Sequence, residues 1–152
     1  DDKPPPKRGK HWTDVGFRTE NPNDDLNNNG ILGLFLPLGV FTKYKNFSSR
    51  IFSLSNGTSP FPLMAVMIAY TNEALKAAQS TDLLLNVKTK DEAWDIILQY
   101  LAGLVNLVAE RWVRDNLNLK HHYMIFNQIA LYGIANIESV VASGALALRE
   151  DL

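Results

Sequence analysis

The chain has 152 residues, 46% of them hydrophobic and 20% charged, which predicts one folded domain and excludes an intrinsically disordered chain. Its formal net charge of -1 provides no overall field that would draw it to nucleic acid or to an anionic membrane. It has no cysteine and only three histidines, so disulfides, thiol nucleophiles and thiolate zinc sites are excluded, and we expect neither a metal site nor a cofactor.

The N-terminal residues 1–11 are expected to form an extended arm. They contain three consecutive prolines and four cations, a composition that favours a polyproline-type conformation without a core. The folded domain is expected to span residues 12–150. Within it, residues 21–30 are rich in Asn and Asp, which offer the backbone local alternatives to helix, so this segment is predicted to be a loop.

Apolar residues at helical spacing predict helices after this loop. The first covers residues 31–41, with Pro37 expected to kink or end it. The second covers residues 63–79 and follows Pro60 and Pro62, which suit the first turn of a helix. Residues 80–90 are polar enough to form a connection with a short turn.

Two further helices are expected in the C-terminal half. One begins at Asp91, with Thr89 or Lys90 beside the cap, and is apolar on nearly all sides, as is typical of the central helix of a bundle. The last is expected to run from about Met124 to Arg149 as one helix. Because no segment alternates with the period of a strand, the predicted fold class is all-α, a single irregular helical bundle.

Four large apolar side chains are predicted to lie in the core of this bundle: Trp94, Leu101, Trp112 and Ile134. His121 and His122 are adjacent, so on a helix they point about 100° apart and cannot share one metal ion, and we expect both at the surface.

Local motifs for catalysis and metal binding are absent from the sequence. It contains no Gly-x-Ser-x-Gly elbow, no Walker A loop and no Gly-x-Gly-x-x-Gly motif. Residues 25–30 match the first half of a calcium-binding loop, but position 12 of that loop is Leu36 and not the required Glu, so we expect no calcium site. The longest apolar run, 31–41, is shorter than the roughly 20 residues of a membrane-spanning helix, and no transmembrane segment is expected.

Four ordered segments resemble the ELMO domain of the engulfment-and-cell-motility proteins and of the related GTPase-activating proteins. Residues 12–18, Trp-Thr-Asp-Val-Gly-Phe-Arg, are similar to the family's Trp-x-x-Leu-Gly-Phe-Gln, and residues 22–34 lie over its Pro-x-x-Asp-Phe-Arg-Gly-x-Gly-x-Leu-Gly-Leu. Residues 60–72 resemble its Tyr-Pro-Phe helix start, and Trp112 with residues 123–127 resembles its Trp and Met-Asp-Phe-Asn block. The resemblance implies an α-helical domain.

One position in the resemblance bears on activity. Family members that activate Arf and Arf-like GTPases carry an arginine finger in Asp-Phe-Arg-Gly, where a cation offsets charge on the transferring phosphoryl group. Here that arginine is replaced by Asn27 and the following glycine by Asn28. The resemblance therefore implies no catalytic residue by the family mechanism, and it leaves enzymatic activity uncertain but not expected.

The leading hypothesis is a catalytically degenerate ELMO domain that docks an Arf-like or Arf small GTPase, or a stable protein partner, and binds no nucleic acid. The partner-binding residues are expected in the loop: Arg18, Asp24, Asp25, Asn27, Asn28 and Asn29. One alternative is an active GTPase-activating protein with a displaced finger, Arg18 first and Arg50 second. Another is a structural subunit of a ciliary or cytoskeletal complex. Without cysteine or a signal peptide, the chain is expected inside the cell, in the cytoplasm, the cilium or the cytoskeleton.

Overall fold

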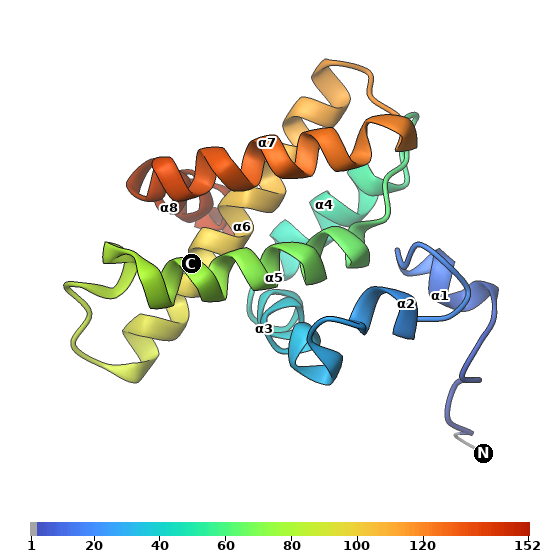
Figure 1. Cartoon of the computed structure of the whole chain (residues 1–152), viewed down its shortest axis with the longest axis horizontal. Coiled ribbons are helices and arrows are strands. Elements are labelled where there is room, and N and C mark those ends of the chain that lie inside the picture. Colours follow the sequence, from blue (N-terminus) through green and yellow to red (C-terminus); the bar gives the residue numbers. More distant parts are fainter. Residues whose placement is uncertain (1–2) are drawn as a thin grey trace.

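The computed structural model describes residues 3–152 and, within them, consists of helices joined by short connections (Figure 1). The all-α prediction is confirmed. The α-helices are α1 (Lys10–Asp14), α2 (Asn23–Leu26), α3 (Phe35–Lys43), α4 (Lys45–Ser55), α5 (Leu63–Ser80), α6 (Lys90–Arg114), α7 (His122–Ala135) and α8 (Ile137–Ala147). Short 3-10 helices are η1 (Gly30–Leu34), η2 (Asp82–Leu84), η3 (Leu119–His121) and η4 (Arg149–Asp151).

Helix α6 forms the centre of the bundle, as its sequence predicts. Its middle is buried continuously from Tyr100 to Asn106, and α3, α4, α5, α7 and α8 all pack against it. Thr89 caps its start, because the Thr89 hydroxyl oxygen accepts a hydrogen bond of 3.1 Å from the backbone N–H of Glu92. A helix surrounded on several faces needs the nearly uniform apolar composition that this segment has.

Two glycines let α6 and α8 cross in close contact. A Cβ atom on Gly103 would lie 2.1 Å from the carbonyl oxygen of Val140, and one on Gly144 would lie 1.8 Å from that of Gln99. Any side chain at either position would push the two helices apart, because backbone atoms cannot move aside as a flexible side chain does. The crossing therefore depends on glycine at both positions.

The N-terminal half contains three helices that the sequence analysis did not predict. Helix α1 begins at Lys10, inside the segment 1–11 that was expected to be extended, one-turn helix α2 lies inside the predicted loop at residues 21–30, and α4 follows α3 after a break at Tyr44. The predicted helix at 31–41 is η1 followed by α3. Pro37 does not end it, since it lies in the first turn of α3, where its missing N–H costs no hydrogen bond.

The predicted C-terminal helix is two helices. The chain bends by 108° between α7 and α8, at Asn136, whose side-chain amide donates a hydrogen bond of 2.9 Å to the carbonyl of Tyr132. Asparagine competes in this way with the regular backbone pattern of a helix. The bend brings α8 back against α6, where Gly144 meets Gln99.

Two of the four predicted core residues are fully buried and two are not. Trp112 and Leu101 have no exposed surface, whereas Trp94 and Ile134 are each 40% exposed. Trp94 lies on the side of α6 that faces α3, and its indole ring packs against Gly39. Helical spacing alone does not show that neighbouring helices cover Trp94, near the start of α6, only in part.

Helix α6 is also the one helix, among residues 3–152, that has the length and hydropathy to cross a membrane by itself. Helices η3–α7 and α8 reach this length and hydropathy only when they are taken as one segment, across the 108° bend between them. In α6, 61% of the most apolar stretch is buried by neighbouring helices. Such burial is typical of the core helix of a helical bundle.

The two tryptophans of α6 should differ in their contribution to stability. We predict that Trp112→Ala lowers the free energy of unfolding by about 3 to 5 kcal/mol, because it empties a fully buried site. Trp94→Ala should cost about 1 kcal/mol, because this ring is partly exposed. Urea unfolding followed by circular dichroism measures both values, and equal losses would contradict the burial described here.

Candidate functional site

Hydrogen bonds to two carboxylates hold the loop Arg18–Asn29 in its shape. The first carboxylate is that of Asp25. It accepts a hydrogen bond of 2.9 Å from the backbone N–H of Arg18 and a second one from the Arg18 guanidinium at Nε. The side chain of Asp25 is only 2% exposed. A buried carboxylate with two donors on one residue fixes the start of the loop against α2.

The second carboxylate, Asp24, closes the turn that precedes α2. It accepts a hydrogen bond of 2.7 Å from the hydroxyl of Thr19 and one of 2.9 Å from the side-chain amide of Asn21. Both acidic residues predicted to bind a partner thus hold the loop in shape. Their carboxylates are engaged in hydrogen bonds within the chain.

Arg18 joins this loop to α7. Besides Asp25, its guanidinium donates at 3.3 Å to the carbonyl of Asp24 and at 3.3 Å to the hydroxyl of Tyr123. The hydrogen bond to Asp25, helped by the charge of that carboxylate, raises the pKa of Arg18 above its ordinary value. Each of the three guanidinium nitrogens therefore has a hydrogen-bond partner within the chain.

Asn27 and Asn28 lie where the loop borders a cavity of about 270 Å³, called here the loop cavity. Arg18, Asp24 and Asp25 line the same cavity, and its other walls come from α5 and α7. Both asparagines are exposed. Asn29 does not line this cavity; its side-chain amide nitrogen is buried, and among residues 3–152 it has no hydrogen-bond partner.

The backbone at Asn27 does not require glycine beside it. Asn27 has φ -53° and ψ -32°, which is right-handed helical geometry. Between residues 18 and 34 the one left-handed residue is Gly30, with φ 55°. Replacing the family's glycine by Asn28 therefore puts no strain on the loop.

The second arginine proposed as a displaced finger lies elsewhere. Arg50 donates a hydrogen bond of 2.9 Å to the side-chain oxygen of Asn106, in a different cavity that Glu110 also lines. Beside the loop cavity, the cation Lys76 pairs at 2.9 Å with Glu73, one of the α5 residues of the wall. Arg50 and Asn27 do not belong to one site.

His122 is the residue of the site that the sequence analysis placed wrongly. It was expected at the surface, but it is 7% exposed, and its ring centroid lies 4.0 Å from that of Phe126. Its Nδ1 atom is buried and, within residues 3–152, has no hydrogen-bond partner. Tyr123 was also not predicted as a site residue, although it opens the Tyr-Met-Ile-Phe-Asn block that carries part of the resemblance. Packing of α7 on the loop, which no local pattern encodes, buries His122.

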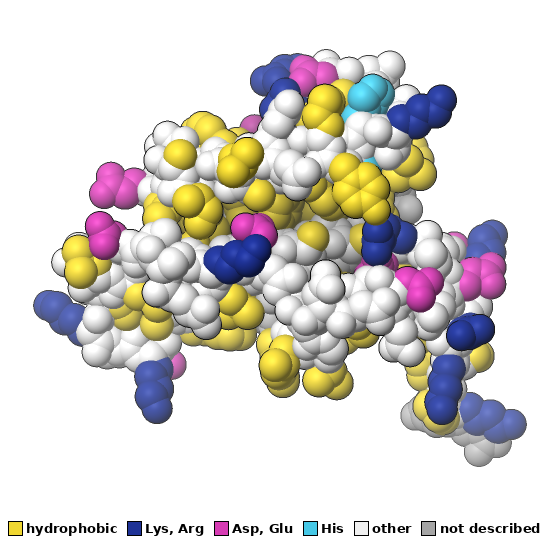
Figure 2. All heavy atoms as spheres, viewed as in Figure 1, with side chains coloured by type: hydrophobic (Ala, Val, Ile, Leu, Met, Phe, Trp, Pro, Cys, Tyr) yellow, Lys and Arg dark blue, Asp and Glu magenta, His cyan; other side chains and the backbone are white. Residues whose placement is uncertain are grey.

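A row of exposed apolar side chains directly follows the loop. Ile31, Leu32, Phe35 and Leu38 are 72%, 61%, 55% and 54% exposed. Figure 2 shows hydrophobic side chains projecting at the lower edge of the molecule, in the region where Figure 1 places η1 and α3. We call these four residues the apolar row. Exposed apolar side chains grouped in this way are typical of a surface that contacts another molecule.

The buried state of His122 predicts a dependence of stability on pH. Burial lowers the pKa of His122 below its ordinary value of 6.5, and the charge of Arg18 lowers it further, against an opposing effect of Asp25. Below about pH 6.5 the unfolded chain therefore binds a proton that the folded chain does not, and the free energy of unfolding falls as the pH is lowered. Above that pH both states are neutral at this residue and the effect vanishes.

Comparing the wild type with His122→Phe, which keeps an aromatic ring beside Phe126, isolates this effect. Urea unfolding between about pH 5 and pH 8 should show a smaller loss of stability at low pH in the variant. Parallel curves for the two proteins would contradict the assignment.

Comparison with known proteins identifies the family of this chain. The model of the ELMO/CED-12 family matches residues 1–130. Among curated proteins, the chain is similar to "ELMO domain-containing protein 3" of Mus musculus, with 27% identity over 107 residues. That match covers 68% of this chain and 28% of the relative. No solved structure matches the chain. On the family match, this chain belongs to the ELMO/CED-12 family.

Proposed function

We propose that this chain is a catalytically degenerate ELMO domain, a protein-interaction module that docks a small GTPase of the Arf-like group. The observation that carries the proposal is Asn27 at the position of the family's arginine finger, exposed at the edge of the loop cavity. A neutral amide cannot offset the charge that develops on a transferring phosphoryl group. The loop around Asn27 is nonetheless held in shape by hydrogen bonds to Asp24 and Asp25, as suits a surface that recognises a partner.

The surface around Asn27 supports docking. Asp24 and Asp25 hold the loop in one shape, so little conformational freedom remains to be lost when a partner binds. The apolar row follows within a few residues and supplies area that a partner would shield from water. We propose that the loop edge at Asn27 and Asn28, together with the apolar row, forms one contact surface.

The rival function, an active GTPase-activating protein that uses Arg18, is disfavoured by the contacts of that residue. To reach a bound nucleotide, the guanidinium would have to leave Asp25, Asp24 and Tyr123. Its departure would leave the carboxylate of Asp25, 2% exposed, without its cation. An unpaired buried charge is strongly unfavourable.

Binding measurements separate docking of a GTPase from a role as a structural subunit of a ciliary or cytoskeletal complex. We predict that an Arf-like GTPase loaded with a GTP analogue binds this chain more tightly than the same GTPase loaded with GDP. Leu32→Asp, in the apolar row, should weaken binding by about tenfold or more, because it places a charge in the contact surface. Leu131→Asp is the matched control, since Leu131 on α7 is also exposed and lies outside this surface.

Isothermal titration calorimetry with a panel of Arf and Arf-like GTPases gives these affinities. Equal affinities for the GTPase loaded with the GTP analogue and with GDP would favour the role as a structural subunit. Equal affinities for Leu32→Asp and wild type would show that the apolar row is not the contact surface.

A further inference from the structure

Helix α7 presents to solvent one side that nothing within residues 3–152 covers. The helix lies on the outside of the bundle in Figure 1, and its buried side packs on α5 and α6. Opposite that buried side lie four exposed residues: Met124, Gln128, Leu131 and Ala135. We call these four residues the α7 seam.

The α7 seam has the spacing of a surface that pairs with another helix. Its residues follow one another at steps of four, three and four, which is the narrow stripe along which helices pack in a coiled coil. Leu131 is 74% exposed and Met124 is 47% exposed. This spacing favours a helix as the partner of the seam.

The composition of α7 favours a second copy of the same helix. From His122 to Ala135 the chain has no Lys, Arg, Asp or Glu, and Figure 2 shows mostly hydrophobic and uncharged side chains where Figure 1 places α7. In a two-fold dimer each residue near the axis meets its own copy, so a charged side chain there would meet a like charge. Helix α7 avoids that repulsion, and it lacks the cations with which surface helices bind anionic membranes.

Gln128 supplies a polar group within the seam. Its side-chain amide carries both donors and an acceptor, so two copies can bond to each other across a two-fold axis. A single polar residue in an apolar seam fixes the register of a helix pair. An axis at Gln128 makes the two helices antiparallel. It brings Met124 of one copy near Leu131 of the other, because these residues lie four positions before and three positions after Gln128.

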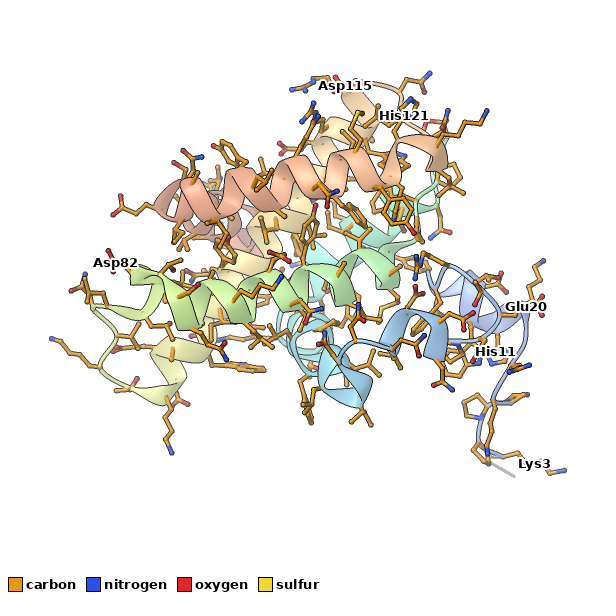
Figure 3. The ribbon with its side chains drawn as sticks, in the orientation of Figure 1. Lys3, His11, Glu20, Asp82, Asp115 and His121 are labelled. Atoms are coloured by element: carbon orange, nitrogen blue, oxygen red, sulfur yellow. The ribbon has the colours of Figure 1, made fainter. Side chains whose placement is uncertain are left out.

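A hollow beside the seam adds contact area. This cavity of about 340 Å³ is lined by apolar residues of α6 and α7 and by Gln128, Arg111 and Arg114. The two arginines pair at 3.4 Å and 2.8 Å with Asp115, which Figure 3 marks at the end of α6. An apolar centre with polar groups at its rim is the usual composition of a protein interface.

From these observations we propose that this chain forms an antiparallel homodimer through the α7 seam, with Gln128 at the two-fold axis. One side of a helix of 14 residues offers fewer residues than the roughly 20 to 30 that each partner contributes to a standard interface. We therefore expect a weak dimer, with a Kd of about 10 to 100 µM. The seam does not line the loop cavity and does not include the apolar row, so the proposal does not depend on GTPase docking.

Sedimentation velocity at concentrations from about 5 to 500 µM tests the dimer. Leu131→Asp should keep the chain monomeric throughout this range, because it places a charge within the apolar seam. Leu85→Asp is the matched control, since Leu85 is 73% exposed on the connection between η2 and α6. This control and Leu32→Asp, in the apolar row, should dimerise as the wild type does.

An exchange of charge at residue 128 tests the position of the axis. Gln128→Glu and Gln128→Lys should each weaken the dimer by about tenfold or more, because each brings two like charges together. An equimolar mixture of the two variants should associate at least as tightly as the wild type, because opposite charges then meet. All substituted positions are exposed, and circular dichroism verifies that each variant is folded.

Four results would overturn the proposal: a wild type that stays monomeric up to about 500 µM, a Leu131→Asp variant that still dimerises, loss of the dimer in Leu32→Asp, or a mixture that associates no more tightly than its two components alone. Leu131→Asp should leave the affinity for a GTPase unchanged. Failure of the dimer and failure of GTPase docking are therefore distinguishable.

Discussion

The pairing of Arg18 with the buried carboxylate of Asp25 is the interaction on which the functional face depends. It sets the loop against α2, and through the hydroxyl of Tyr123 it ties the loop to α7. Because Arg18 and Tyr123 also line the loop cavity, these contacts shape its walls. The geometry of the candidate site thus rests on one ion pair.

This arrangement explains why the loop does not need an arginine at position 27 to keep its shape. The loop is shaped by Asp24 and Asp25, which lie before the finger position and do not involve it. Asn27 continues the right-handed backbone of α2, and its side chain is exposed. Another exposed side chain at this position would leave the fold of the loop unchanged. A choice between Asn and Arg at this position therefore changes the charge of the surface and leaves the supporting structure in place.

Sequence periodicity predicted the parts of the fold that are governed by burial along one helix. Helices α5 and α6, the Thr89 cap and the buried Trp112 follow from local pattern. Helix α4 was missed because its serines and short length obscure it, although Phe47, Ile51 and Ser55 recur every four residues and are all buried. The division of α7 from α8 was missed because both helices are apolar and only Asn136 marks the bend.

The candidate site was predictable only in part. The resemblance brought Arg18, Asp24, Asp25 and the asparagines to one loop, and the structure places all of them except Asn29 around one cavity. Asp24 and Asp25 are engaged by Arg18, Thr19 and Asn21, only three to seven residues away, in bonds that apolar spacing does not reveal. The position of His122 is set by α7, which meets the loop through contacts such as the Arg18–Tyr123 bond, with a separation of 105. Such long-range contacts leave no local periodic pattern.

Single-turnover GTP hydrolysis by Arf-like GTPases, with and without this domain, tests the central claim most directly. The account predicts that wild type leaves the rate unchanged and that Asn27→Arg accelerates hydrolysis, with Asn27→Gln as the uncharged control; a well-placed finger contributes a factor of about 10³ to 10⁵. Acceleration by the wild-type domain that Arg18→Ala abolishes would contradict the account and identify Arg18 as the finger.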